Sequence, residues 1–267
     1  HDKSSIVKKS ALAVFAHPDD IEFVAAGTMF LLAEAGYDLH YFLLCSGNCG
    51  AMDLGPEDIR GVREAEARKA AGILGARFYP SIADDLELVY NVENLRKVAA
   101  VVRHAEPSLV LTHSPQDYME DHMNASRLAV TAAFAREMPN FFTDPVAGEM
   151  EGEVAVYHAM PHQLIDQLRK PIVPDFLIDT GSVHQTKRKA LTAHASQKEW
   201  LDRTQGMDSY IQTMDDLSCE VGKFSGRTMH AEGWRRHSHM GFSAKPDFDP
   251  LTDALSSHHY SLPQTKE

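Results

Sequence analysis

The segment ALAVFAHPDD, residues 11–20, gives the clearest signal of how this chain folds. The apolar run of residues 11–16 is typical of a strand buried in a parallel sheet. His17, Asp19 and Asp20 follow it, and a helical pattern covers residues 21–35. In an open α/β sheet such a junction lies at the carboxyl edge, where ligands bind. We therefore predict a functional site at this edge.

A second polar cluster, Asp117-Tyr118-Met119-Glu120-Asp121-His122, follows the predicted strand of residues 108–112. Two strand ends thus bring His and Asp side chains to the same edge of the sheet. Catalytic zinc commonly takes three protein ligands of this type and keeps one position open for water. We predict that His17, Asp20 and His122 bind Zn²⁺ and that the spare Asp19 acts as the general base.

Other interpretations of these residues stay open. Iron, cobalt or manganese could occupy the same ligands. Without a metal, Asp19 and Asp20 would cap a helix and His17 would make a loop contact. Cys45 and Cys49 form a weak second candidate, since two soft ligands without another pair are more often buried or loop thiols.

The composition indicates a globular protein with an acidic surface. The chain has 267 residues, 43% hydrophobic and 24% charged, with a formal net charge of −12. Such a charge disfavours nucleic acid and anionic membranes as partners, and no apolar run is long enough to span a bilayer. The three cysteines do not form a disulfide framework. The segment at residues 1–10 carries no apolar signal core, which favours a cytoplasmic location.

The order of the predicted elements indicates an α/β fold. Strands at residues 11–16, 39–45, 77–80, 109–112, 154–158 and 176–180 alternate with helices at residues 21–35, 56–75, 91–106, 124–136 and 183–202. This alternation predicts a Rossmann-like three-layer fold with a mostly parallel sheet. We predict a single domain over residues 1–267, with a core of about residues 10–200 and a helical or loop extension over about residues 201–267, whose end from Lys245 is a surface arm.

His17-Pro18-Asp19-Asp20 resembles the AHPDD signature of the PIG-L/LmbE family of zinc-dependent deacetylases. Further matches are Arg63-Glu64, Asp121-His122 and the HxSQ-like segment His194-Ala195-Ser196-Gln197. The resemblance implies removal of an acetyl group from an N-acetylglucosamine-type sugar or glycoconjugate. It also implies that His17, Asp20 and His122 bind zinc and that Asp19 is the general base.

The same resemblance gives roles to residues outside the ligand set. Arg63 would bind a substrate hydroxyl or phosphate, and Asp121 would orient a ligand histidine from outside the metal shell. Arg63 could instead be an exposed helix arginine paired with an acid, and Asp121 a helix cap. His194 could line the site as a substrate contact or pack under the sheet.

The chain departs from the family pattern at two positions. Met119 stands where members commonly have the first histidine of HPDH, which is thought to stabilise the oxyanion or assist proton transfer. His113, His194 and the run from Arg235 to His239 are the candidates to replace it. We favour His237 and His239 as catalytic residues, acting in their own site or across a homo-oligomer, although a solvated loop explains the run equally well. At the second position Asn48 stands near the usual acid, which suggests a different ligand for that loop.

Three functions compete at this stage. The leading one is zinc-dependent deacetylation of a small acetamido sugar. An amidase acting on a larger conjugate, such as a thiol-sugar, is the alternative among hydrolases. A carbohydrate-binding protein that keeps its metal but has lost turnover with the Met119 change is the alternative outside enzymes.

Overall fold

The computed structural model describes residues 9–205 and 209–263. Within these two ranges, eight strands form one sheet in the order β3-β2-β1-β4-β5-β7-β6-β8. Their bounds are β1 Ser10–Phe15, β2 Asp38–Leu43, β3 Arg77–Tyr79, β4 Leu109–Thr112, β5 Ala155–Ala159, β6 Phe176–Asp179, β7 Ala231–Arg236 and β8 His259–Ser261. Neighbouring strands from β3 to β5 are parallel, whereas β7 pairs antiparallel with both β5 and β6. The predicted α/β fold with a mostly parallel sheet is confirmed.

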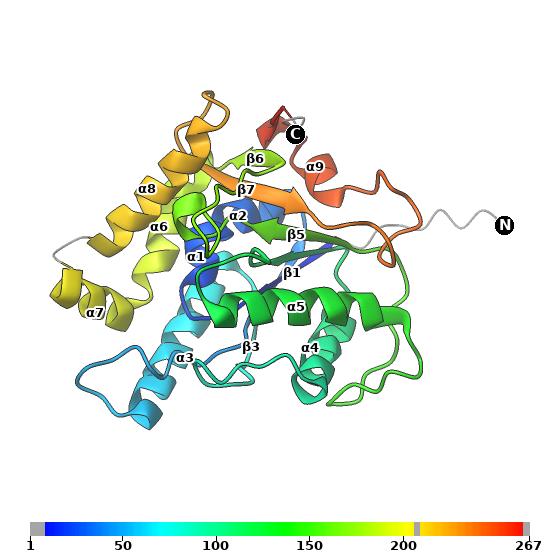
Figure 1. Ribbon diagram of the computed structural model, residues 1–267, viewed down its shortest axis with the longest axis horizontal. Coiled ribbons are helices and arrows are strands. Elements are labelled where there is room, and N and C mark those ends of the chain that lie inside the picture. Colours follow the sequence, from blue (N-terminus) through cyan, green and yellow to red (C-terminus); the bar gives the residue numbers. More distant parts are fainter. Residues whose placement is uncertain (1–8, 206–208, 264–267) are drawn as a thin grey trace.

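Helices cover both faces of the sheet and make the fold three-layered (Figure 1). They are α1 Asp20–Val24, α2 Ala26–Glu34, α3 Pro56–Leu74, α4 Val92–Ala105, α5 Glu120–Phe134, α6 His184–Thr192, α7 Ala195–Gln205, α8 Ser209–Lys223 and α9 Pro250–Ala254. The pleat of β1 directs Ala11, Ala13 and Phe15 to the face covered by α1, α2, α3, α6 and α8. Leu12 and Val14 point to the opposite face, against α4 and α5. Both faces are buried, which explains the unbroken apolar run of β1.

Several boundaries differ from the predictions. The predicted helix of residues 21–35 is two helices that meet at Ala25, and the helix of residues 183–202 is broken before Ala195. Helix α5 begins at Glu120, four residues earlier than predicted, so His122 lies in its first turn. His122 is therefore held by a helix, whereas His17 lies in the turn between β1 and α1.

The chain after residue 201 contributes strands as well as helices and loops. β7 lies inside the sheet between β5 and β6, and β8 forms the edge beside β6. The sequence of β7 gives no apolar run because it contains Glu232, which is 3% exposed. Its carboxylate accepts hydrogen bonds from Gly27 N and Thr28 N at the start of α2 and from Lys187 Nζ, at 2.7–2.8 Å. A buried charge with these partners is tolerated. Residues 231–236, which we predicted as part of a helical or loop extension, are therefore a strand of the core sheet.

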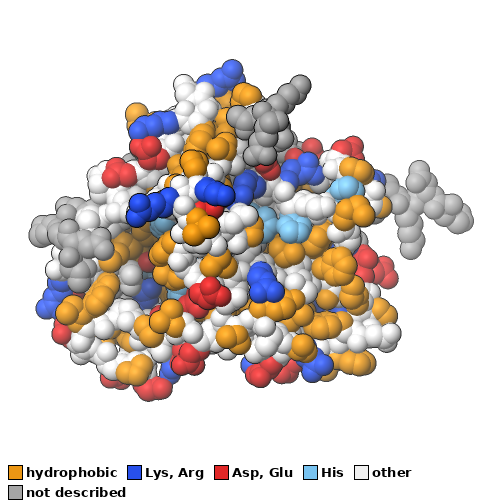
Figure 2. All heavy atoms as spheres, viewed as in Figure 1, with side chains coloured by type: hydrophobic (Ala, Val, Ile, Leu, Met, Phe, Trp, Pro, Cys, Tyr) orange, Lys and Arg blue, Asp and Glu red, His pale blue; other side chains and the backbone are white. Residues whose placement is uncertain are grey.

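The surface mixes charged and hydrophobic side chains (Figure 2). The exposed large hydrophobic residues include Leu86, Tyr118 and Phe142, with 74%, 59% and 66% of their surface accessible. Leu86 and Tyr118 border the site described below. Among the helices of the described residues, none is long and apolar enough to cross a membrane.

Candidate metal centre and active site

The structure brings the three predicted metal ligands together at the carboxyl edges of β1 and β4. His17 follows β1, Asp20 begins α1, and His122 lies in the first turn of α5. Their ligand atoms lie within 4.8 Å of one another. Asp20 Oδ2 is 3.3 Å from both His17 Nδ1 and His122 Nε2. The parallel order of the two strands explains this meeting of residues about a hundred positions apart.

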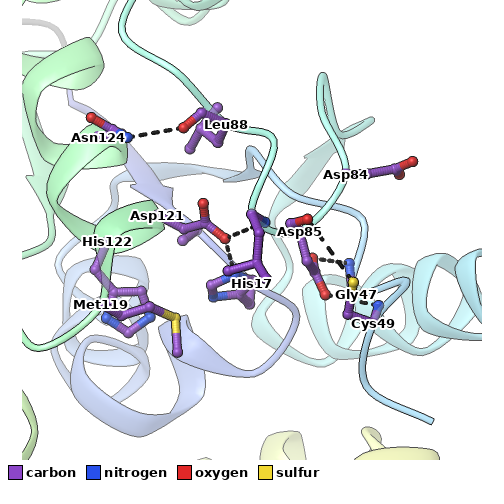
Figure 3. A network of polar contacts seen from close by, with 12 residues as sticks. His17, Gly47, Cys49, Asp84, Asp85, Leu88, Met119, Asp121, His122 and Asn124 are labelled. Atoms are coloured by element: carbon purple, nitrogen blue, oxygen red, sulfur yellow. Dashed lines mark hydrogen bonds and ion pairs between the residues drawn. The ribbon is translucent and has the colours of Figure 1, made fainter.

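Each of these histidines is oriented by a carboxylate on its far side. His17 Nε2 hydrogen-bonds Asp121 Oδ2 at 2.9 Å (Figure 3), and His122 Nδ1 hydrogen-bonds Asp117 Oδ1 at 3.0 Å. The other nitrogen of each ring is turned to Asp20. Metal-binding histidines usually have this outer carboxylate, which fixes the tautomer and the ring orientation. The donor set therefore fits a divalent transition metal.

Two more ligand groups overlap with this one. His17 with Cys45 and Asp121, and His113 with Asp117 and His122, also bring their donor atoms within 4.8 Å. Of the three groups, only that of His17, Asp20 and His122 has all its members on the wall of the cavity. A metal at this group alone would be open to a substrate.

The charges of the cluster stabilise one another. Burial raises the pKa of Asp20, but His122, His113 and His17 outweigh it and hold the pKa well below its usual range. Burial lowers the pKa of His122, but Asp20 and Asp117 raise it overall to about 9. The pKa of His17 is raised for the same reason, mainly by Asp121 and Asp20 against burial. The centre thus favours positive charge around the Asp20 carboxylate, which a cation would also supply.

Asp19 lies beside the three ligands but points to a different partner. Its backbone is in the left-handed region, with φ of 99°, a conformation that costs energy for a residue other than glycine and often marks a functional site. Tyr210 donates a hydrogen bond to Asp19 Oδ2 at 2.6 Å, and Oδ1 accepts none from the described residues. Burial raises the pKa of Asp19 to about 6, although Arg63 opposes the shift. A carboxylate with one free oxygen on the cavity wall suits a base.

Arg63 lines the cavity from α3 and is only 3% exposed, so it is not a surface arginine. Its Nη2 donates to Pro18 O at 2.7 Å and its Nη1 to Gln197 Oε1 at 2.8 Å. No acid pairs with it in an ion pair among the described residues. Arg63 therefore ties the Pro18 turn to α7, and a substrate contact would use its remaining N–H groups.

Asn48 makes a loop contact. Its Oδ1 accepts a hydrogen bond from Asp85 N at 2.9 Å, and it is not among the residues that line the cavity. The carboxylate of Asp85, in the loop after β3, accepts hydrogen bonds from Gly47 N and Cys49 N at 2.8 and 3.1 Å (Figure 3). Asp85 also lines the cavity. The acid that the sequence lacks near Asn48 is thus supplied from a distant loop.

The predicted histidines of the late segments lie elsewhere. His194 is fully buried and hydrogen-bonds Glu22 Oε2 at 3.0 Å, so it packs under the sheet. His237 Nδ1 hydrogen-bonds His158 Nε2 at 2.8 Å, and neither His237 nor His239 lines the cavity. His113 is buried against Ala16 N and Asp20 Oδ2. None of these four histidines lines the cavity. Antiparallel β7 carries His237 toward the amino end of β5, away from the carboxyl edge of the sheet.

A cavity of about 480 Å³ opens over the three ligands. Its aromatic wall contains Phe23, Tyr118, Trp200 and Tyr210. Met119 lines it beside His122, and so does His162, which follows β5 (Figure 3 labels Met119 and His122). Our sequence predictions missed His162, Tyr210, Asp85 and Asp117. Only Asp117 had a local signal, since it belongs to the polar cluster after β4.

This arrangement is that of a metal-dependent hydrolase with an α/β fold. Residues 12–133 match the family model described as PIG-L, GlcNAc-PI de-N-acetylase. The chain is 31% identical to the 4-oxalmesaconate hydratase of Pseudomonas putida over 199 residues, which cover 72% of this chain and 75% of the relative. It therefore belongs to the PIG-L family, whose members include metal-dependent deacetylases.

Other comparisons agree with this assignment. A probable N-acetyl-alpha-D-glucosaminyl L-malate deacetylase of Bacillus anthracis is 29% identical, with 71% of this chain and 82% of the relative covered. The solved N,N'-diacetylchitobiose deacetylase of Pyrococcus horikoshii superposes with a TM-score of 0.73 over 90% of this chain and 87% of that one. At 20% identity the latter supports the fold alone.

Proposed function

We propose that this protein is a zinc-dependent hydrolase that removes the acetyl group from a small acetamido sugar or glycoconjugate. The observation that carries the proposal is the pairing of an oriented ligand set with a spare buried carboxylate. His17, Asp20 and His122 meet at one centre on the cavity wall, and Asp19 lies next to them with one oxygen free. Hydrolysis of an amide needs these two parts, a cation for the carbonyl and a base for water.

In this reaction the metal ligands and Asp19 have separate roles. His17, Asp20 and His122 would hold the metal, while Asp117 and Asp121 fix the two rings. A bound divalent metal polarises a carbonyl oxygen and lowers the pKa of a coordinated water. Asp19 takes a proton from the attacking water and returns it to the nitrogen as the C–N bond breaks. Acetate and a free amine leave.

The charge of the cavity favours a neutral substrate. Among the described residues, Asp19, Asp20 and Asp85 contribute carboxylates to its wall, and Arg63 is the only lysine or arginine there. A divalent metal would bring this balance to about zero. A polyanion would therefore gain little beyond the metal itself, whereas the aromatic wall suits the face of a sugar. We infer that the substrate is an uncharged N-acetylglucosamine derivative.

A second candidate is hydration of a carbon–carbon double bond. The 31% identity to a hydratase and the methionine at position 119 favour it. That relative acts on 4-oxalmesaconate, a polycarboxylate. Among the residues that the structure describes, Arg63 is the one permanent cation on the cavity wall, and two of its N–H groups are already engaged. We therefore rank hydration below deacetylation.

The two candidates separate in one assay series. The purified zinc-loaded protein is incubated with methyl N-acetylglucosaminide, N,N'-diacetylchitobiose and N-acetylglucosamine 6-phosphate, and acetate and free amine are measured. In parallel, loss of ultraviolet absorbance is followed with a conjugated tricarboxylate. We expect acetate and amine in equal amounts, fastest from the neutral sugars. Absorbance loss without acetate would establish the hydratase instead. Stoichiometric metal with neither reaction would support a larger conjugate or a binding role.

A further inference from the structure

We propose that His162 is the catalytic residue that takes the place of the histidine missing at Met119, donating a hydrogen bond to the oxyanion that forms from the substrate carbonyl. This inference rests on the proposed hydrolysis. The chain needs such a donor because a thioether cannot donate a hydrogen bond. The acyl-transfer reaction also leaves negative charge on the carbonyl oxygen, which a directed donor stabilises.

His162 is the additional histidine on the cavity wall. Within the described residues, the histidines that line the cavity are His17, His122 and His162. The first two belong to the metal centre. His162 comes from the end of β5, next to β4 in the sheet, so it enters from the strand that neighbours the ligand-bearing one. Of the histidines predicted for this role, His194 and His237 hydrogen-bond Glu22 and His158, away from the cavity. His113 lies behind Asp20 and does not line the cavity.

The surroundings of His162 leave its polar atoms available. Phe23 and Tyr118 hold the ring by edge contacts, with centroids 5.5 and 5.9 Å away. His122 lies on another side at 6.4 Å. No side-chain hydrogen bond to the ring is formed by any residue of segments 9–205 and 209–263. An imidazole carries an N–H donor whether it is neutral or charged, so the role does not depend on its protonation.

The backbone holds His162 in place at a cost. The next residues, Gln163 and Leu164, have φ of 62° and 56°, both in the left-handed region. Two consecutive residues of this kind that are not glycine cost energy and persist only where the surroundings fix them. Leu164 N donates to Pro161 O at 3.1 Å and Ile172 N donates to Leu164 O at 2.8 Å. This fixed turn presents the ring to the cavity.

The test compares three variants with the zinc-loaded wild type on the best neutral sugar found above. His162→Ala should lower kcat by about 10²- to 10³-fold with little change in KM or metal content, as for loss of an oxyanion donor. His162→Gln keeps an N–H and should recover at least tenfold of that loss. His104→Gln, an exposed histidine of α4, is the matched control and should behave as wild type.

Each outcome has one meaning. Equal kcat for His162→Ala and wild type overturns the inference and leaves the proposed function intact. Equal losses in the Ala and Gln variants overturn the donor role and leave only a contribution to cavity shape. A thermal unfolding scan of each variant shows that the compared proteins are folded. Absence of acetate from the wild type would instead contradict the proposed function itself.

Discussion

Two acidic residues of the five-residue helix α1 have opposite surroundings, although they are only two positions apart. Asp20 faces His17 and His122 on the wall of the cavity. Glu22 faces the interior, where Tyr41 and His194 donate to its carboxylate and none of its surface is exposed. Both sites pair a buried carboxylate with imidazole, and only the first opens to a cavity. Residue type alone therefore does not identify a functional site, because access to solvent and substrate decides it.

The largest effect is expected at the Asp20 side. Asp20→Ala removes the carboxylate between the two histidines and should abolish metal binding. Acetate release should fall by more than about 10³-fold, since both carbonyl polarisation and water activation are lost. Metal content by mass spectrometry and turnover are measured together. Asp38→Ala, an exposed aspartate of β2, is the control, and retention of one metal per chain by Asp20→Ala would contradict the assignment.

The next effect separates chemistry from metal binding. Asp19→Asn keeps the shape of the side chain and the contact to Tyr210, but it removes the base. We expect kcat to fall by about 10²- to 10⁴-fold while the metal stays bound. A variant that turns over at the wild-type rate would show that another group accepts the proton.

At the Glu22 side the effect should be on stability. Glu22→Leu leaves the Tyr41 hydroxyl and His194 Nε2 without their acceptor in the core. The free energy of unfolding should fall by about 3 kcal/mol, measured by urea denaturation. Turnover per metal-loaded folded chain should stay within about twofold of wild type, since buried Glu22 has no route to the reacting atoms. Glu22→Gln, which keeps one acceptor, is the milder control. A loss of turnover without a loss of stability would mean that the two sides are not separate.

The last effect, which is the smallest near neutral pH, concerns His158, whose buried ring hydrogen-bonds His113 O. Burial lowers its pKa to about 4, against about 6.5 in the unfolded chain. The unfolded state therefore binds the extra proton first, and stability is lost as the pH falls from about 6.5 toward 4. This shift corresponds to about 3 kcal/mol at most. His158→Gln should flatten that part of the stability–pH curve, whereas His104→Gln should leave it unchanged. If the stability–pH curve of His158→Gln matches that of the wild type, His158 does not cause this pH dependence.

The parts of the fold and site that could be predicted have local signals. The apolar run of residues 11–16 and the polar residues after it place His17, Asp19 and Asp20 at the sheet edge, and the cluster after β4 adds His122. The start of a helix and the end of a strand are visible in a few consecutive residues, so these predictions needed no tertiary information.

The parts that were missed depend on tertiary contacts. Strand β7 could not be recognised from the sequence because it contains the charged Glu232. The partners that stabilise this charge, Lys187 and the start of α2, are far away in the sequence. His162 reaches the cavity because the two residues after it have positive φ, and no sequence pattern predicts such a turn. His194 appears in a family-like motif, yet its partner Glu22 keeps it in the core. In each case the deciding partner lies on another element.

Removal and return of the metal is the decisive test of metal-dependent deacetylation by this protein. The wild-type protein is stripped with a chelator and reloaded with Zn²⁺, Fe²⁺, Co²⁺ or Mn²⁺, and acetate release from methyl N-acetylglucosaminide is measured at each step. We expect one metal per chain, loss of acetate release on stripping and recovery on reloading. Undiminished acetate release from the metal-free protein would contradict this expectation.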